Sequence, residues 1–165
     1  MVDSDGANPL RLTSGPDASS RPDPVGLAMS PSWSPDGSQF AFSWASEGSW
    51  RIGVYNFSTD RISWKTSVRP GTIAITPAFS PDGGSIAYGY GDEQGTNLWL
   101  VDLNGGAPRR LNLTRGSDNA APTFSPDGRR IAFMSGRAGH PEIYTMDADG
   151  SGAELLTEFN YGERN

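Results

Sequence analysis

The sequence contains no cysteine, which excludes disulfides and thiolate metal sites. No apolar run approaches the roughly 20 residues that a membrane helix needs, so no membrane span is expected. The opening residues, MVDSDGANPL, have neither a basic region nor an apolar stretch, so no signal peptide is predicted there. The longest basic stretches are Arg109-Arg110 and Arg129-Arg130, too short for a phosphate-binding surface, and nucleic acid is not an expected partner.

Residues suited to catalysis are also scarce. The single histidine, His140, lies in a Gly-His-Pro loop, and no Gly-x-Ser-x-Gly pattern accompanies it, so a Ser-His-Asp triad has no support. One histidine cannot by itself supply the several ligands that a metal site needs. The neighbouring acids Asp92 and Glu93 are interpreted as a solvated loop, and Asp149-Gly150 as a hairpin turn. We therefore predict no catalytic, cofactor or metal site and no enzyme activity.

Glycine and proline, in contrast, are abundant. The 165 residues include 21 Gly and 13 Pro, and only 35% are hydrophobic. This composition favours many short strands in one domain over a helical bundle. The net charge of −6, from 13 basic and 19 acidic residues, is interpreted as a solubility feature.

A tetrapeptide repeats three times along the chain. Ser-Pro-Asp-Gly occurs at 34–37, 80–83 and 125–128, a spacing of 46 and then 45 residues. In each copy the residue types suit a tight turn, with proline second and glycine fourth, where φ is often positive. The turn would join two antiparallel strands. Each copy follows an aromatic residue expected to be core between repeats, namely Trp33, Phe79 or Phe124.

Each tetrapeptide begins a series of further predicted strands. These strands are 39–42, 51–57 and 62–68 in the first repeat; 85–88, 97–103 and 109–114 in the second; and 130–133, 142–148 and 153–157 in the third. With the aromatic strand, each repeat becomes a four-stranded antiparallel meander of about 45 residues, the size of a propeller blade. The predicted blades span 31–68, 77–114 and 122–157. Residues 2–13 match 146–157 at the end of the third repeat, which predicts an N-terminal half-blade over 1–13.

The third repeat, PTFSPDGRRIAFMSGRAGHPEIYTMDADGSGAELLT, resembles the TolB-type β-propeller repeat, which is related in form to tryptophan-aspartate repeats. The resemblance covers residues 31–157; the first repeat departs most, with Asp60-Arg61 in place of an Asp-Gly hairpin. It implies an all-β partial propeller, a bacterial periplasmic or cell-envelope setting, and protein binding.

Three whole blades and a half are too few for the six-bladed ring that the resemblance implies. Three alternatives remain: a fragment of a longer propeller, which we favour; self-association with a second copy that completes the ring; or a small ring closed by one chain. The first two leave apolar end faces to be covered, because terminal repeats need polar caps.

The meander also predicts which loops share a face. The loops 45–50, 91–97 and 135–141 should gather with the connections 14–30, 69–76 and 115–121 on the face opposite the Ser-Pro-Asp-Gly turns. The candidate partner-binding residues there are Glu47, Trp50, Asp92, Glu93, Asp118, Arg137 and His140. The favoured function is a non-catalytic module that binds a protein or peptide. The alternative is an accessory propeller from a serine peptidase of the prolyl-oligopeptidase or tricorn type.

Overall fold

The computed structural model describes residues 26–46, 48–67, 69–111 and 117–158. Within these ranges the chain forms twelve strands, no helix, and three separate four-stranded sheets whose neighbouring strands run antiparallel. None of the described segments is a helix that is long and apolar enough to cross a membrane. The predicted half-blade, 1–13, and the candidate residue Glu47 lie outside the described residues.

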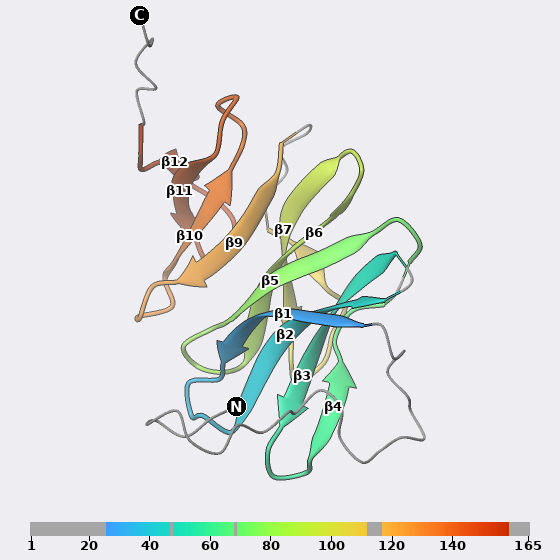
Figure 1. Ribbon diagram of the computed structural model, residues 1–165. Helices are drawn as coiled ribbons and strands as arrows, with labels where there is room; N and C mark the ends of the chain where they lie inside the picture. The colour runs from blue at the N-terminus through green and yellow to red at the C-terminus, as the bar shows by residue number, and fades with distance from the viewer. Residues whose placement is uncertain (1–25, 47, 68, 112–116, 159–165) are drawn as a thin grey trace, which may run out of the picture.

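Each sheet is one blade, with its strands in sequence order (Figure 1). Blade 1 consists of β1 (Leu27–Trp33), β2 (Gln39–Ser46), β3 (Ser49–Asn56) and β4 (Arg61–Trp64). Blade 2 consists of β5 (Ile73–Phe79), β6 (Ser85–Asp92), β7 (Gly95–Asp102) and β8 (Arg109–Arg110). Blade 3 consists of β9 (Asn119–Phe124), β10 (Arg130–Ser135), β11 (Glu142–Asp147) and β12 (Glu154–Leu155). The predicted all-β class and the four-stranded meanders are confirmed.

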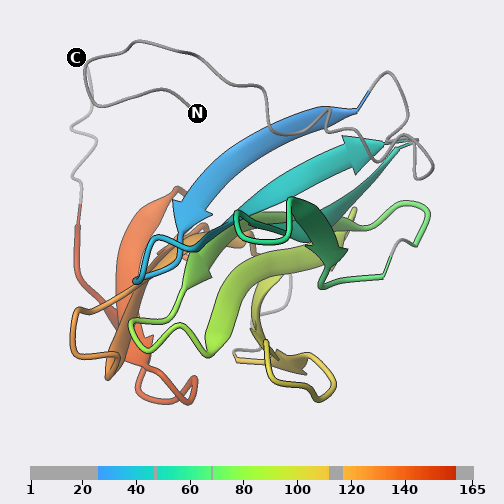
Figure 2. The ribbon, with the colours of Figure 1, turned by 90° about the horizontal axis from the view of Figure 1, so that it is seen from below.

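The blades pack side by side through their first strands. Strand β5 contacts β1 on one side and β9 on the other, so these three strands form the inner wall of the assembly (Figure 1). Seen from below, the sheets follow one another as an open fan (Figure 2). Among the described residues, one core cluster joins blades 1 and 2 and another joins blades 2 and 3, but none joins blades 1 and 3.

The same two kinds of sheet face meet, in the same order, at both junctions between blades. Each blade has an aromatic face, represented by Phe42, Tyr88 and Phe133, and an aliphatic face, represented by Ile52, Leu98 and Ile143. The aromatic face of blade 2 packs on the aliphatic face of blade 1, and the aromatic face of blade 3 packs on the aliphatic face of blade 2. This alternation follows from the period of two in a strand. It leaves the aromatic face of blade 1 and the aliphatic face of blade 3 without a described neighbour.

The Ser-Pro-Asp-Gly turns have the predicted geometry. Gly37, Gly83 and Gly128 all have φ of +71°, as a residue without Cβ allows. In the third turn, the Ser125 hydroxyl donates a 2.6 Å hydrogen bond to Asp127, whose carboxylate also accepts the Arg129 N–H at 3.1 Å. The equivalent bonds lower the pKa of Asp36 to about 2, with the Ser34 hydroxyl as the main cause.

The first strands begin earlier than the predicted blade limits, at Leu27, Ile73 and Asn119. In each one the pairing register shifts around a proline, and the residue before that proline has φ of +51° to +53°. The three residues with this conformation are Ser30, Thr76 and Ala121. A bulge of this kind lets the strand continue through a residue that has no N–H to donate.

Hydroxyl groups of the preceding blade bind the backbone at two of these bulges. The Thr76 N–H donates to the Ser43 hydroxyl at 3.0 Å, and the Ala121 N–H donates to the Thr76 hydroxyl at 2.9 Å. Blade 2 has Gly89 where blade 1 has Ser43, and a Cβ there would lie 3.3 Å from the Asn119 carbonyl oxygen. Blades 2 and 3 therefore approach each other closely at Gly89. The hydroxyl that binds the bulge of blade 3 belongs to Thr76 instead of to a residue at position 89.

The expectation that all three repeat aromatics are core between blades is wrong for Trp33. Phe79 is only 8% exposed, whereas Trp33 is 54% exposed and stacks on Phe57 of its own blade at 5.4 Å between centroids. The physical reason is that burial at this position depends on a preceding blade, and no described sheet precedes blade 1.

The outer strands β4, β8 and β12 are shorter than predicted. In two blades a threonine beyond the strand continues the hydrogen bonding, because Thr66 accepts the Ile52 N–H at 2.9 Å and Thr157 accepts the Ile143 N–H at 3.0 Å. Residues 112–114 of the outer strand predicted for the second repeat, 109–114, lie outside the described residues.

Candidate functional site

The hairpins β2–β3, β6–β7 and β10–β11 lie at the same end of their sheets, together with the segments that lead into β5 and β9 (Figure 1). We call this surface the loop face. It holds the described candidate residues Trp50, Asp92, Glu93, Asp118, Arg137 and His140, and the Ser-Pro-Asp-Gly turns lie at the opposite end. The structure therefore gathers these candidates on one side, although it gives them different environments.

At the junction of blades 1 and 2, Trp50 is tied through its backbone. Its N–H donates to the Thr72 carbonyl oxygen at 3.1 Å, and the Ser49 hydroxyl donates to the Arg69 carbonyl oxygen at 3.1 Å. These bonds join the β2–β3 hairpin to the segment that enters blade 2. The indole of Trp50 is half-buried, so this residue presents part of its ring to the surface.

At the junction of blades 2 and 3, Asp118 has the equivalent role. Its carboxylate accepts the Thr96 N–H at 3.3 Å, and its carbonyl oxygen accepts the Gly136 N–H at 2.9 Å. Thr96 occupies the position of Trp50 in the preceding blade, and Pro141 occupies it in blade 3. Proline has no N–H, so the third blade cannot form this bond with a following sheet.

Asn119, which the sequence did not single out, organises the polar core of this junction. It is fully buried, and its side-chain amide donates to the Thr96 carbonyl oxygen at 3.0 Å. Arg137 donates to the Asn119 side-chain oxygen at 3.2 Å and to the Ser135 hydroxyl at 2.9 Å. The Arg137 guanidinium also lies 4.4 Å from the centre of the Tyr144 ring, a favourable cation–π contact. Arg137 therefore supports the loop face from within.

His140 is paired with a buried acid. Its Nδ1 lies 3.1 Å from Oε1 of Glu142, whose side chain is 1% exposed. The Thr157 hydroxyl donates to the other carboxylate oxygen of Glu142. The His140 side chain is 39% exposed, so part of it can contact a partner while Nδ1 faces the buried Glu142 of the β10–β11 hairpin.

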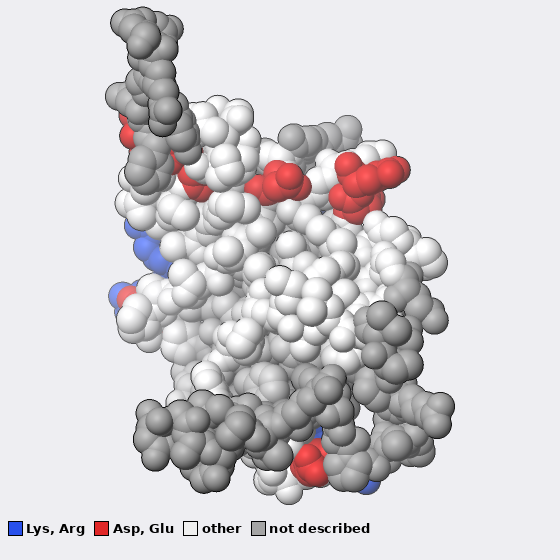
Figure 3. All heavy atoms as spheres, viewed as in Figure 1, with Lys and Arg blue, Asp and Glu red and all other residues white. Residues whose placement is uncertain are grey.

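Asp92 and Glu93 are the most available of the candidates. Both are exposed, and Asp92 accepts the Gln94 N–H at 2.9 Å within its own loop. Acidic side chains gather along the upper edge of the molecule in Figure 3, above a central region without charge. That centre corresponds to β1, β5 and β9, whose sequences contain no Asp, Glu, Lys or Arg. Across the described ranges, no group of three or more His, Asp and Glu side chains is arranged to hold a metal ion.

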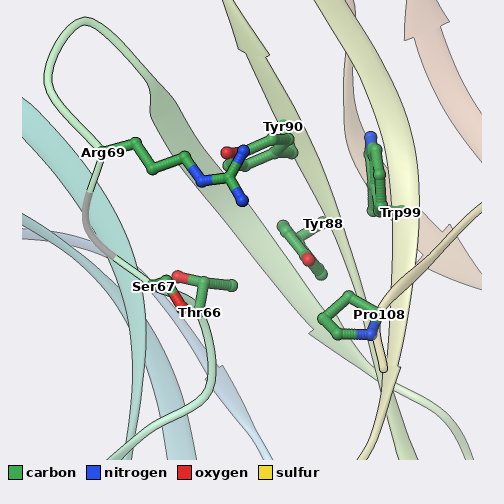
Figure 4. Close-up of a pocket in the computed structure, with 7 residues that line it drawn as sticks. All are labelled: Thr66, Ser67, Arg69, Tyr88, Tyr90, Trp99 and Pro108. Atoms are coloured by element: carbon green, nitrogen blue, oxygen red, sulfur yellow. The ribbon is translucent and has the colours of Figure 1, made fainter. Parts of the chain in front are cut away.

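A groove between blades 1 and 2 was not anticipated from the sequence. It encloses about 250 Å³ and is lined by Thr66, Ser67, Arg69, Tyr88, Tyr90, Trp99 and Pro108 (Figure 4). The two tyrosines lie two residues apart in β6, and Trp99 faces Tyr88 across the β6–β7 pair. This cross-strand aromatic pattern was the available signal, but the depth of the groove depends on where blade 1 ends.

Four-stranded antiparallel sheets that stack face to face, with their first strands innermost, define this chain as part of a β-propeller. A family model described as the TolB beta propeller domain matches residues 1–165. The chain belongs to the TolB β-propeller family. A search of curated proteins found no match.

Solved structures give the same fold. A structure described as TolB from Agrobacterium tumefaciens has a TM-score of 0.71 and 22% sequence identity, and the match covers 79% of this chain and 49% of that one. TolB from Acinetobacter baumannii has a TM-score of 0.65 and 25% sequence identity, and the match covers 78% of this chain and 32% of that one. A prolyl endopeptidase has a TM-score of 0.61 and 13% sequence identity, and the match covers 81% of this chain and 22% of that one. The chain thus spans about half or less of each of these proteins.

Proposed function

We propose that this chain is a non-catalytic, partner-binding part of a TolB-type propeller, and that its loop face binds a protein or peptide. The observation that carries the proposal is that the candidate residues differ in their contacts with the rest of the molecule. Asp118 bonds Thr96 of the preceding blade and Arg137 supports Asn119 within blade 3, whereas Asp92 and Glu93 project from the rim without a described contact to another blade. Exposed loop residues on a rigid scaffold are well placed for binding.

The proposed partner carries basic residues next to an apolar segment. The acidic residues Asp92, Glu93 and Asp118 lie on the rim, beside the inner wall formed by three uncharged strands. Opposite charges at the rim accelerate association and fix orientation, and the uncharged wall can bury apolar side chains. Family membership supports protein binding as the general role, and the periplasmic or cell-envelope setting remains part of this proposal.

A displayed peptide library selected against the chain tests the proposal. We expect the selected peptides to be basic and to shift the backbone amide NMR signals of residues 91–97. The double variant Asp92→Asn/Glu93→Gln should weaken binding by about tenfold, the effect of losing charged contacts at a partly exposed site. The matched control, Asp102→Asn/Asp149→Asn, changes the same charge on the opposite face. Peptides that shift only the Ser-Pro-Asp-Gly turns would refute the proposal.

The second candidate is an accessory propeller of a serine peptidase. It is supported by the similarity in fold to prolyl endopeptidases, although the chain covers only 22% of that structure. A hydrolase domain encoded beside this stretch would favour this alternative. An envelope signal sequence upstream, without such a domain, would favour the first. Turnover by the chain alone in a hydrolase and lyase screen would contradict both.

The two open faces bear on how the propeller is completed. Trp33 and Trp64 of blade 1 are 54% and 37% exposed, and Ile143 and Leu156 of blade 3 are 38% and 64% exposed. Further blades are proposed to cover them, either from a longer chain or from a second copy. Sedimentation decides between these: a mass of twice 17.6 kDa, lowered by Trp33→Ser, supports the second copy. A monomer that binds a hydrophobic dye supports the longer chain.

A further inference from the structure

The groove between blades 1 and 2 combines an aromatic wall with a cation, Arg69, that forms no ion pair within the described ranges. Tyr90 and Trp99 meet edge to face at 5.4 Å between centroids, and Tyr88 and Tyr90 do so at 6.4 Å. Tyr88 forms the floor; it is 2% exposed, and burial raises its pKa. Tyr90 and Trp99 are only partly buried. Aromatic rings that are fixed by such mutual contacts can bind an apolar side chain at little entropic cost.

Arg69 is held at the mouth of the groove by its own backbone. Its carbonyl oxygen accepts hydrogen bonds from the Thr72 N–H at 3.1 Å, the Thr72 hydroxyl at 2.8 Å and the Ser49 hydroxyl at 3.1 Å. In Figure 4 its side chain extends over the groove toward Tyr90. The guanidinium is therefore placed over the aromatic wall by a fixed loop.

No carboxylate among the described residues pairs with the Arg69 guanidinium. The described part of the chain contains three ion pairs, and Arg69 takes part in none of them. Residues 61–76 contain Arg61, Lys65 and Arg69 and no acidic residue, although the whole chain has a net charge of −6. Arg110 is paired with Trp99 across β7 and β8, so it lies on the same face of the sheet and adds positive charge.

The shape of the groove limits what can occupy it. Its volume of about 250 Å³ lies below the roughly 300 Å³ at which drug-sized ligand pockets begin, so it suits one amino-acid residue. The ligand needs an apolar side chain against Tyr90 and Trp99 and an anion within reach of Arg69. The last residue of a polypeptide has both on a single Cα, and arginine binds a carboxylate through two parallel hydrogen bonds.

We propose that this groove binds the carboxyl-terminal residue of a partner polypeptide that ends in an aromatic or large aliphatic side chain. Arg69 pairs with the terminal carboxylate, and Tyr90 and Trp99 pack against the side chain. The site is separate from the acidic rim, and it favours the opposite charge. This inference therefore does not depend on the loop-face proposal.

The test uses a hexapeptide, acetyl-Gly-Gly-Gly-Ser-Gly-Phe, as the free acid and as the terminal amide. Binding is followed by the indole N–H signals in NMR spectra, and the Trp99 signal is assigned from its loss in Trp99→Phe. We expect the acid to shift the Trp99 indole signal and to leave that of Trp33 unchanged. The amide should bind at least tenfold more weakly, because it cannot form the charged pair. Equal binding of acid and amide would overturn the proposal.

Variants separate this site from the rim. Arg69→Gln should weaken binding of the acid by at least tenfold, and Arg69→Lys should restore part of it. Arg129→Gln, whose side chain is 86% exposed on blade 3, is the matched control. Asp92→Asn should not weaken binding of the acid, since it removes a negative charge two residues from Tyr90, whereas the loop-face proposal predicts a loss for its basic peptides. N-acetylphenylalanine that binds as tightly as the hexapeptide would overturn the assignment to a polypeptide end.

Discussion

Blade 2 and the two outer blades are built on one template but differ in how much of their surface is covered. Leu98 in blade 2 is fully buried, whereas Ile143, at the same position in blade 3, is 38% exposed. Leu111 and Leu156 each donate an N–H to the third strand of their blade, and they are 7% and 64% exposed. The difference shows that a blade's apolar residues are core only when a neighbouring sheet covers them.

The largest expected effect comes from the covered face. Leu98→Ala should lower the free energy of unfolding by about 3 kcal/mol, because it leaves a cavity between blades 2 and 3. Ile143→Ala should cost about 1 kcal/mol, because its side chain already contacts solvent. Urea unfolding of both variants measures the difference. Equal losses would mean that the aliphatic face of blade 3 is covered in solution.

The next largest loss of stability is expected at the buried polar contacts between blades 2 and 3. Blade 3 has the buried Asn119 at the position where blade 2 has the buried Ala74. Asn119→Ala should cost about 2 kcal/mol, since it removes the buried hydrogen bonds that the Asn119 side chain forms with the Thr96 carbonyl oxygen and the Arg137 guanidinium. Arg137→Met should cost less, because Arg137 is half-exposed. Thermal unfolding compares the two variants, and a larger loss for Arg137→Met would place the organising contact on the arginine instead.

A smaller loss of stability is expected from substitutions in the Ser-Pro-Asp-Gly turns, and it should be the same in blades 1 and 3. Gly128→Ala and Gly37→Ala each place a Cβ at φ of +71°, which costs about 1 kcal/mol for an L-residue. An added Cβ has nothing within 4 Å at Gly37 and meets Pro81 at 3.6 Å at Gly128, so neither variant clashes. Matched denaturation curves should therefore give similar losses. A large loss at Gly128 alone would show that its turn contacts the preceding blade more tightly.

The smallest effect concerns pH and should be shared by all three turns. Serine hydroxyls lower the pKa values of Asp36, Asp82 and Asp127 below the ordinary 3.8. A folded-state pKa below the unfolded one stabilises the fold above pH 3.8, and this contribution disappears as pH falls toward the lowered value, about 2 for Asp36. Unfolding measured between pH 5 and 2 should show a shallower decline in the triple Asp→Asn variant. An unchanged slope would contradict the role of the turns.

Much of the fold follows from local patterns in the sequence. The 46- and 45-residue spacing of the turns, and strands beginning at Gln39, Ser85 and Arg130, are properties of short segments, so the sequence was sufficient to predict them. The left-handed residues before the prolines were not predicted, because the residue before a proline normally favours an extended conformation. At Thr76 and Ala121 a hydroxyl from the previous blade binds the bulge, a contact between residues far apart in sequence that no local pattern reveals.

The candidate site was less predictable. The topology of the meander places Asp92, Asp118 and Arg137 on one face, and the structure has them there. Their individual roles depend on contacts between residues that are distant in sequence, such as Arg137 with Asn119. The groove depends on the distance between two sheets, which no pattern within one repeat encodes. The exposure of Trp33 was mispredicted for the same reason.

Pro141 sets a limit on what can follow blade 3 in space. In the first two blades this position supplies an N–H that fastens the rim of one sheet to the segment entering the next. A sheet docked against Ile143 would lack that backbone hydrogen bond at the rim. Of the successive seams between sheets, the one beyond blade 3 should therefore separate most readily at its rim, making it the natural place for the assembly to flex or to exchange a neighbour.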